Sequence, residues 1–172
     1  MMLRLFTLIF PALFLMTSHS FAAGGFRQLN PVSPPDLVLK TLAADNLNLN
    51  DYRGKVVLVN FWAAWCPPCR REMPSMQRLK EKMSGRPFAI LGVDSAEQRE
   101  DAEGFLKTIK VDFPILLDPD GSATRRWKVF ALPTSFLVDR HGKVRYSISG
   151  PTEWDEGEAI QIIESLLQER EK

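Results

Sequence analysis

The order of hydrophobic and polar positions predicts strands and helices that alternate along the chain. Nearly unbroken apolar runs over residues 55–61 and 88–93 are typical of strands covered on both faces of a sheet. Between them lies a stretch in which apolar residues recur at helical spacing, with charged residues on the opposite side. Its apolar positions are Met73, Met76, Leu79 and Met83. We therefore expect a buried strand, a helix and a second buried strand in succession.

The second half of the chain continues this alternation. The apolar face of a second helix is formed by Ala102, Phe105, Leu106 and Ile109. Further elements follow in chain order. They are a strand over 113–117, a short helix over 122–127, a strand over 135–139, an alternating strand over 143–148 and a helix over 154–168. Near the start of the chain, residues 36–40 and 47–49 are short strands that can pair as a hairpin. This order predicts the α/β class, with a mixed central sheet and helices on both of its faces.

The first 22 residues have the features of a secretory signal peptide. Arg4 supplies a charged start, residues 5–16 are an apolar run, and residues 20–22 offer small side chains at a cleavage site. The run is short for a membrane span, which needs about 20 apolar residues. We predict cleavage after Ala22, and an uncleaved membrane anchor is the alternative.

The remaining residues divide into a linker and one domain. Residues 23–35 are rich in proline and glycine and are predicted to be a flexible linker. Residues 36–170 have the length of a single domain. If the signal is exported by a bacterium, this domain lies in the periplasm, where disulfides persist.

The charge balance argues against a nucleic-acid partner. The chain has 22 basic and 21 acidic residues, and cleavage of the signal removes Arg4 and no acid, which leaves 21 of each. Such a balance gives no electrostatic attraction toward a polyanion. Two local acidic clusters, over residues 97–103 and 153–158, are interpreted as solvated helix faces.

The chain has only two cysteines, Cys66 and Cys69, and they lie where the first buried strand leads into the first helix. With two residues between them, they can close a disulfide within the first helical turn and alternate between dithiol and disulfide. The stabilisation from a disulfide grows with the loop that it closes, so this short loop favours a redox role. A purely structural disulfide is the alternative.

The start of the helix assigns different roles to the two sulfurs. Unpaired N–H groups and the positive end of the helix dipole favour the thiolate, and they lower a cysteine pKa from about 8.5 toward roughly 3.5–7.5. Cys66 is thus the expected attacking sulfur, and Cys69 the resolving thiol. Pro67 suits the first helical position, where its missing N–H would have no partner, and Pro68 removes a second donor from the same turn.

The sequence around the pair gives little support to a metal or haem site. A zinc site needs about four ligands, and the only histidines are His19, in the predicted signal, and His141. Covalent haem attachment requires histidine directly after the second cysteine, where this chain has Arg70. We expect no metal ion and no other cofactor, with zinc as the weaker alternative.

The chain resembles the thioredoxin superfamily and, within it, the exported TlpA/ResA-like thiol-disulfide oxidoreductases. The matching segments are residues 54–62, 65–74 and 132–139, and the likeness extends over roughly residues 36–167. This resemblance implies a thioredoxin-like fold. It also implies a cis peptide bond before Pro133, which would open backbone groups beside it to a substrate chain.

The same resemblance implies a set of site residues. Catalytic roles are expected for Cys66, Cys69, Glu72 and Pro133, and substrate contacts for Trp65, Pro67, Pro68, Leu132 and Thr134. Cytoplasmic thioredoxins carry a buried aspartate six residues before the first cysteine, whereas this chain has Asn60, which cannot titrate. Glu72 stands at the place of the active-site glutamate in ResA-like proteins. We expect it to accept a proton from the pair or to tune its pKa, and an exposed helix carboxylate is the alternative.

These observations predict an exported protein-disulfide reductase that acts on protein thiol/disulfide substrates. A membrane protein is the expected electron donor, and a monomer the expected state. Cytochrome c or metalloprotein maturation is a candidate role, although Thr134 stands where some cytochrome maturation reductases have glutamate. The alternatives are a disulfide oxidase or isomerase, or a binding module for a metal or an apo-protein that has no catalytic activity.

Overall fold

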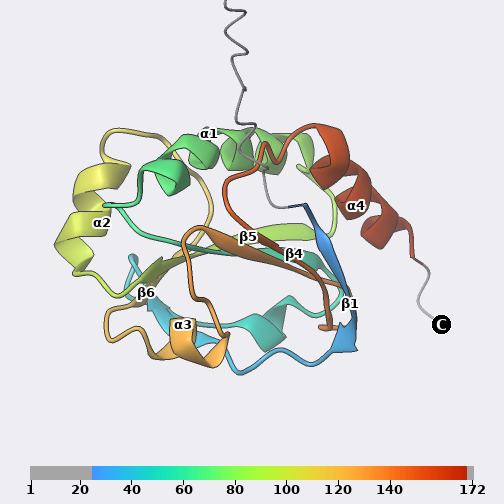
Figure 1. Ribbon diagram of the computed structural model, residues 1–172, viewed down its shortest axis with the longest axis horizontal. Coiled ribbons are helices and arrows are strands. Elements are labelled where there is room, and N and C mark those ends of the chain that lie inside the picture. The colour runs from blue at the N-terminus through green and yellow to red at the C-terminus, as the bar shows by residue number, and fades with distance from the viewer. Residues whose placement is uncertain (1–24, 170–172) are drawn as a thin grey trace, which may run out of the picture.

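One eight-stranded sheet runs through residues 25–169, the part of the chain that the computed structural model describes (Figure 1). The strands are β1 (Arg27–Val32), β2 (Val38–Thr41), β3 (Asn46–Asn48), β4 (Val56–Trp62), β5 (Phe88–Ser95), β6 (Ile115–Asp118), β7 (Thr134–Val138) and β8 (Val144–Ser149). Their order in the sheet is β1-β8-β7-β4-β5-β6-β2-β3. Strands β4, β5 and β6 are parallel to one another and the other pairs are antiparallel, so the sheet is mixed, as predicted. The predicted signal peptide, residues 1–22, lies outside the described residues.

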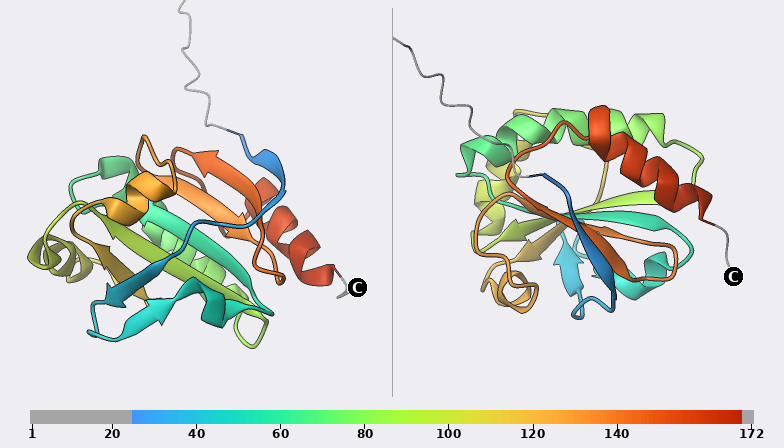
Figure 2. Two further views of the ribbon diagram at one scale, coloured as in Figure 1. Left: turned by 90° about the horizontal axis from the view of Figure 1, so that it is seen from below. Right: turned by 45° about the vertical axis from the view of Figure 1, so that its right-hand side comes forward.

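Helices cover both faces of this sheet. They are α1 (Pro67–Lys82), α2 (Arg99–Leu106), α3 (Ser122–Arg126) and α4 (Gly157–Gln168), with a short 3₁₀ helix, η1, at Leu49–Tyr52. Apolar residues of α1, α2 and α4 pack in one core cluster, whereas α3 contributes to a second cluster on the other side of β4 (Figure 2). The predicted α/β class with helices on both faces is confirmed.

The register around β4 assembles one edge of the sheet. Every residue of β4 is buried, in keeping with its nearly unbroken apolar sequence. Phe61 of β4 lies opposite Thr134 at the start of β7, and Trp62 lies beside Asp94 near the end of β5. The end of β4, which leads into the cysteines, therefore meets the segment that contains Pro133.

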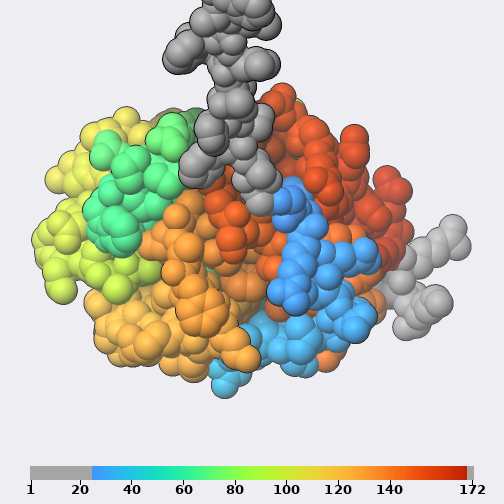
Figure 3. Space-filling view, in the orientation of Figure 1, coloured from blue at the N-terminus to red at the C-terminus, as the bar shows by residue number. Residues whose placement is uncertain are grey.

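A strand replaces part of the predicted linker. Residues 23–35 were expected to have little fixed structure, and this prediction is wrong for β1, which pairs with β8 and lies along the surface (Figure 3). The segment is mostly exposed, with only Leu29 partly buried, and it is held mainly by backbone pairing at the edge of β8. Pro31 is tolerated because an edge strand leaves some N–H positions unpaired. Hydrophobic patterning does not reveal a strand of this kind.

Two residues of the predicted solvated acidic clusters are buried. Glu97 is one, and Asp155 is the other. Asp155 accepts hydrogen bonds from Arg78 Nε at 2.8 Å and Nη2 at 3.0 Å, and the guanidinium lowers its pKa. Arg78 is 77 residues away in the sequence, so a local run of charge gives no sign of the pairing.

We expect Gly92→Ala to destabilise the fold. A Cβ at Gly92, on buried β5, would lie 2.9 Å from Ile115 Cδ1 and 3.2 Å from Trp62 Nε1. Overpacking of this kind lowers the free energy of unfolding by roughly 1–3 kcal/mol, which urea unfolding can measure. Gly104→Ala is the matched control, because its Cβ on α2 would meet no atom within 4 Å and alanine favours a helix. Equal stability of the two variants would contradict the packing argument.

Candidate redox site

Cys66 and Cys69 form a disulfide at the start of α1, with a Cα–Cα distance of 5.4 Å. Cys66 is the N-cap residue of the helix, and Pro67 and Pro68 occupy its first two positions. The Cys66 sulfur accepts a hydrogen bond from the backbone N–H of Cys69 at 3.3 Å. One of the unpaired N–H groups of the helix start thus points at this sulfur, which is the placement that favours a thiolate.

The two cysteines differ slightly in exposure. Cys66 keeps 3% of its surface exposed and Cys69 keeps none. Trp65, directly before Cys66, is 66% exposed, Pro67 is also exposed, and Pro68 is half-buried. An incoming molecule would therefore reach Cys66 before Cys69.

The loop before β7 supplies the other side of the site. The peptide bond between Leu132 and Pro133 is cis, and Pro133 is buried. Thr134 is buried as well, and its hydroxyl donates to Ala131 O at 2.8 Å and lies 3.2 Å from Ser149 Oγ. The Thr134 side chain is therefore engaged within the protein. Any contact that this residue makes with a substrate has to use its backbone.

Glu72 is a buried carboxyl on the second turn of α1, so the alternative of an exposed helix carboxylate is wrong. It accepts hydrogen bonds from Asn60 Nδ2 at 2.7 Å, Thr152 N at 3.2 Å and Trp154 Nε1 at 3.4 Å. Burial raises the pKa of Glu72 from 4.5 to about 7, and the three hydrogen bonds offset only part of that effect. A group with this pKa can exchange a proton near neutral pH.

Asn60 holds Glu72 in place from the central strand. Its Nδ2 donates to Glu72 Oε1 and also to Ser135 Oγ at 2.8 Å, so one amide joins β4, α1 and β7. Asn60 was predicted only as a residue unable to titrate. The structure gives it a positioning contact that its place in the sequence did not reveal, because Ser135 is 75 residues away.

The sequence interpretation missed two acids beside the redox loop. Asp94 and Glu97 are both buried, and Glu97 Oε1 accepts the backbone N–H of Ala64 at 2.6 Å. A signal was present in the sequence, since an aspartate ends the apolar run of β5 at the carboxyl edge of the sheet. Open α/β sheets commonly place functional groups at this edge.

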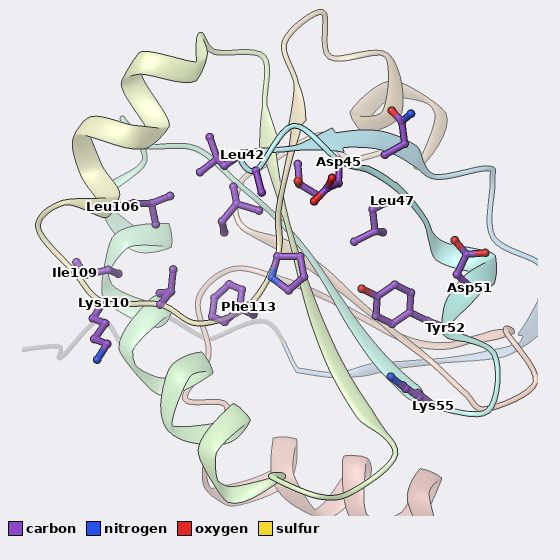
Figure 4. Close-up of a pocket in the computed structure, with 16 residues that line it drawn as sticks. Leu42, Asp45, Leu47, Asp51, Tyr52, Lys55, Leu106, Ile109, Lys110 and Phe113 are labelled. Atoms are coloured by element: carbon purple, nitrogen blue, oxygen red, sulfur yellow. The ribbon is translucent and has the colours of Figure 1, made fainter.

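Two hollows differ in their relation to the cysteines. One of about 820 Å³ lies between β3, η1 and the segment after α2, and it is lined by residues such as Tyr52, Leu106 and Phe113 (Figure 4). Neither cysteine lines it. Another, of about 560 Å³, lies beside the redox loop and is lined in part by Trp65 and Glu97. Only this second hollow adjoins the site.

Metal-binding residues do not gather in the described part of the chain. Across residues 25–169, no group of three or more histidine, cysteine, aspartate or glutamate side chains is arranged to hold a metal ion. In the disulfide form the two sulfurs are bonded to each other, so neither is a thiolate ligand.

Comparison with known proteins places this geometry in context. The profile of the AhpC/TSA family matches residues 33–147. The thiol-disulfide oxidoreductase ResA of Bacillus thuringiensis subsp. konkukian (strain 97-27) is 37% identical over 116 residues, which cover 67% of this chain and 67% of that protein. Two solved structures are also similar. A thiol:disulfide interchange protein of the thioredoxin family from Chlorobium tepidum TLS has a TM-score of 0.70 and 27% identity, covering 82% of this chain and 99% of that chain. The pneumococcal exposed lipoprotein thioredoxin from Streptococcus pneumoniae strain TIGR4 has a TM-score of 0.67 and 26% identity, covering 77% and 100%.

Proposed function

We propose that this chain works as a reductase of protein disulfides. The proposal starts from its family, because the chain belongs to the AhpC/TSA family and is a ResA-like thiol-disulfide oxidoreductase. The observation that carries this proposal is the Cys66–Cys69 disulfide at the start of α1, the helix that also holds the buried carboxyl of Glu72. A peroxidase function is not favoured, because the chain has no cysteine outside this pair.

The reduction proceeds in two exchange steps. In the dithiol form, the Cys66 thiolate attacks one sulfur of the substrate disulfide, and the other substrate sulfur leaves as a thiolate and takes up a proton. Cys69 then transfers its proton to the Glu72 carboxylate and attacks the Cys66 sulfur. The second substrate thiolate leaves and is protonated. The substrate has gained two electrons and two protons, and the protein ends as the disulfide.

Glu72 suits the role of proton acceptor in the second step. It follows Cys69 by three residues, a spacing that brings two side chains together on one helix. A general base works best when its pKa is near the working pH, and the pKa of Glu72 is about 7. Asn60 stands where cytoplasmic thioredoxins have a buried aspartate, and it cannot accept a proton. Glu72 therefore takes this role in the proposed mechanism.

A protein is the substrate that best fits the surface around the pair. Four large apolar side chains of the described residues are exposed, and two of them belong to the loops of the site. Trp65 precedes Cys66, and Phe130, which is 93% exposed, lies three residues before Pro133. Exposed aromatic side chains are common where proteins dock. We propose cysteine pairs of proteins that await a haem or a metal ion as the substrates.

The electron supply and the location follow from the same proposal. Each cycle leaves a disulfide, which needs two electrons from another dithiol, and we propose a membrane protein as the donor to a monomeric reductase. Export through residues 1–22 would place the domain in the periplasm, in keeping with the description of one similar structure as an exposed lipoprotein. Within residues 25–169, no helix has the length and apolar character needed to cross a bilayer.

The reduction potential tests the direction of electron flow. For a reductase we expect a reduction potential near about −270 mV or below, measured in equilibrium with a thiol buffer. An oxidase stabilises its reduced form strongly and has a potential near about −120 mV. The fraction of disulfide can be followed by alkylation and mass spectrometry. Cys69→Ser is the control, since it cannot close the intramolecular disulfide and should show no two-electron transition. A potential close to −120 mV would contradict the reductase function and favour an oxidase.

A further inference from the structure

Asp94 and Glu97 form a buried carboxyl pair that the proposed exchange steps do not use. Asp94 has no exposed surface, and Glu97 is 8% exposed. Within the described residues, no N–H or O–H donor reaches either carboxyl oxygen of Asp94. Burial, and then the neighbouring Glu97 carboxyl, raises the pKa of Asp94. We therefore expect Asp94 to keep its proton.

This pair is attached directly to the loop before Cys66. Glu97 Oε1 accepts the N–H of Ala64 at 2.6 Å, and Ala64 lies two residues before Cys66. The Cys66 N–H in turn donates to Ala63 O at 3.1 Å, so the loop is a tight turn whose position depends on its few hydrogen bonds. A charge on Glu97 is thus held against the backbone two residues before Cys66.

The charged groups that face Asp94 come from several elements. Asp101 on α2 and Asp118 at the end of β6 add negative potential, and the oxygens of Asp118 accept hydrogen bonds from residues 123 and 124. Arg70 on α1 is the nearby cation that lines the same hollow as Glu97, and its guanidinium lies 4.9 Å from the Phe105 ring centroid. Burial is the largest cause of the raised pKa of Asp94, and Glu97 and these two acids add to it. The protonated form of Asp94 is therefore favoured.

We propose that Asp94 and Glu97 are a positioning pair, which holds the redox loop through Ala64 and keeps one negative charge near Cys66, so that the dithiol is a stronger electron donor. The start of α1 stabilises the Cys66 thiolate, and a nearby negative charge opposes that effect. Oxidants of this chemistry are strong because their reduced form is stabilised. Opposing the stabilisation therefore favours reduction of the substrate. The inference rests on the proposed reductase function.

Isosteric amides separate the charge from the shape of the pair. Asp94→Asn places an N–H donor beside Glu97 and keeps the negative charge of Glu97. Asp94→Asn/Glu97→Gln removes that charge but keeps an oxygen that can accept the N–H of Ala64. In a Cys69→Ser background, the rate of Cys66 alkylation against pH gives the thiol pKa. We expect that pKa to be about half a pH unit lower in the double amide variant than in Asp94→Asn, which makes alkylation at acidic pH roughly threefold faster.

A second readout uses the intact cysteine pair. The same comparison with Cys69 present should show a roughly threefold change in the glutathione equilibrium at pH 8, toward the dithiol form. This change corresponds to about 15 mV, because tenfold is about 30 mV for a two-electron couple. Glu100→Gln is the matched control, since it removes a charge from an exposed position of α2 and should shift the thiol pKa less.

The outcome does not depend on which way electrons flow in the cell. A thiol pKa that is unchanged or higher in the double amide variant, or one that Glu100→Gln lowers equally, overturns the inference. If the double variant does not unfold cooperatively, Glu97→Gln alone is used with the same expected drop, because burial, the largest cause, still keeps Asp94 protonated. Failure of the reductase function would instead appear in the potential of the wild-type protein.

Discussion

Replacing Cys66 with serine should abolish disulfide reduction, with a loss of several orders of magnitude in rate. Cys66 is the N-cap of α1, and it is the cysteine that retains some exposure, so we assign the first attack to it. A serine hydroxyl at this place is not ionised near neutral pH. The measurement is thiol release from a model protein disulfide, with a small dithiol as the electron source.

Cys69→Ser should fail in a different way. Its Cys66 can still attack, but nothing resolves the product, so the variant should accumulate as a mixed disulfide with its partner. Mass spectrometry of the trapped species from cells would identify the substrate. Cys66→Ser/Cys69→Ser is the control and should trap nothing. Turnover by Cys66→Ser would contradict the assigned order of attack. An equal yield of partner from the double variant would instead favour a binding role that does not depend on the thiols.

The centre of the fold could be predicted because its sequence signals are strong and local. β4 and β5 are fully or largely buried, so their apolar residues run together, and α1 repeats its apolar residues at helical spacing. β1 gave no such signal, because its residues are mostly exposed and it is held by the edge of β8. A strand that depends on a neighbour's unpaired backbone cannot be recognised from its own side chains.

The site divides in the same way. Cys66 and Cys69 are three positions apart at a helix start, so their pairing and order follow from local geometry. The environment of Glu72 could not be predicted, because Thr152 and Trp154 approach it from about 80 residues away. The burial of Glu97 was missed for a related reason. Charged residues follow it from Arg99 onward, and only the tertiary fold brings it to the redox loop.

Glu72→Gln should remove the pH dependence that the wild-type protein shows near neutrality. Only ionised Glu72 can accept the Cys69 proton, so the wild-type rate should rise as the pH increases through about 7. The variant should lack this rise, and at pH 8 it should be slower by roughly 10²–10⁴, the range of general acid–base catalysis. Single-turnover oxidation of the dithiol protein, measured from pH 5 to 9, checks both statements. A variant that keeps the rise would show that another group takes the proton.

Glu72→Gln should slow the reaction but raise the free energy of unfolding at pH 8. Because the pKa of Glu72 is raised in the folded protein from 4.5 to about 7, its contribution to stability is fully present below 4.5 and is lost as the pH rises through 7. The gap between the two values corresponds to roughly 3 kcal/mol. The introduced amide stays neutral and can donate to Asn60 Oδ1, which has no hydrogen-bond partner among the described residues. Urea unfolding of the disulfide form should therefore find Glu72→Gln more stable than wild type at pH 8 and close to it at pH 5. A variant that is less stable at both values would contradict the raised pKa as the source of the stability difference, and would mean that the hydrogen bonds of the Glu72 carboxyl outweigh it.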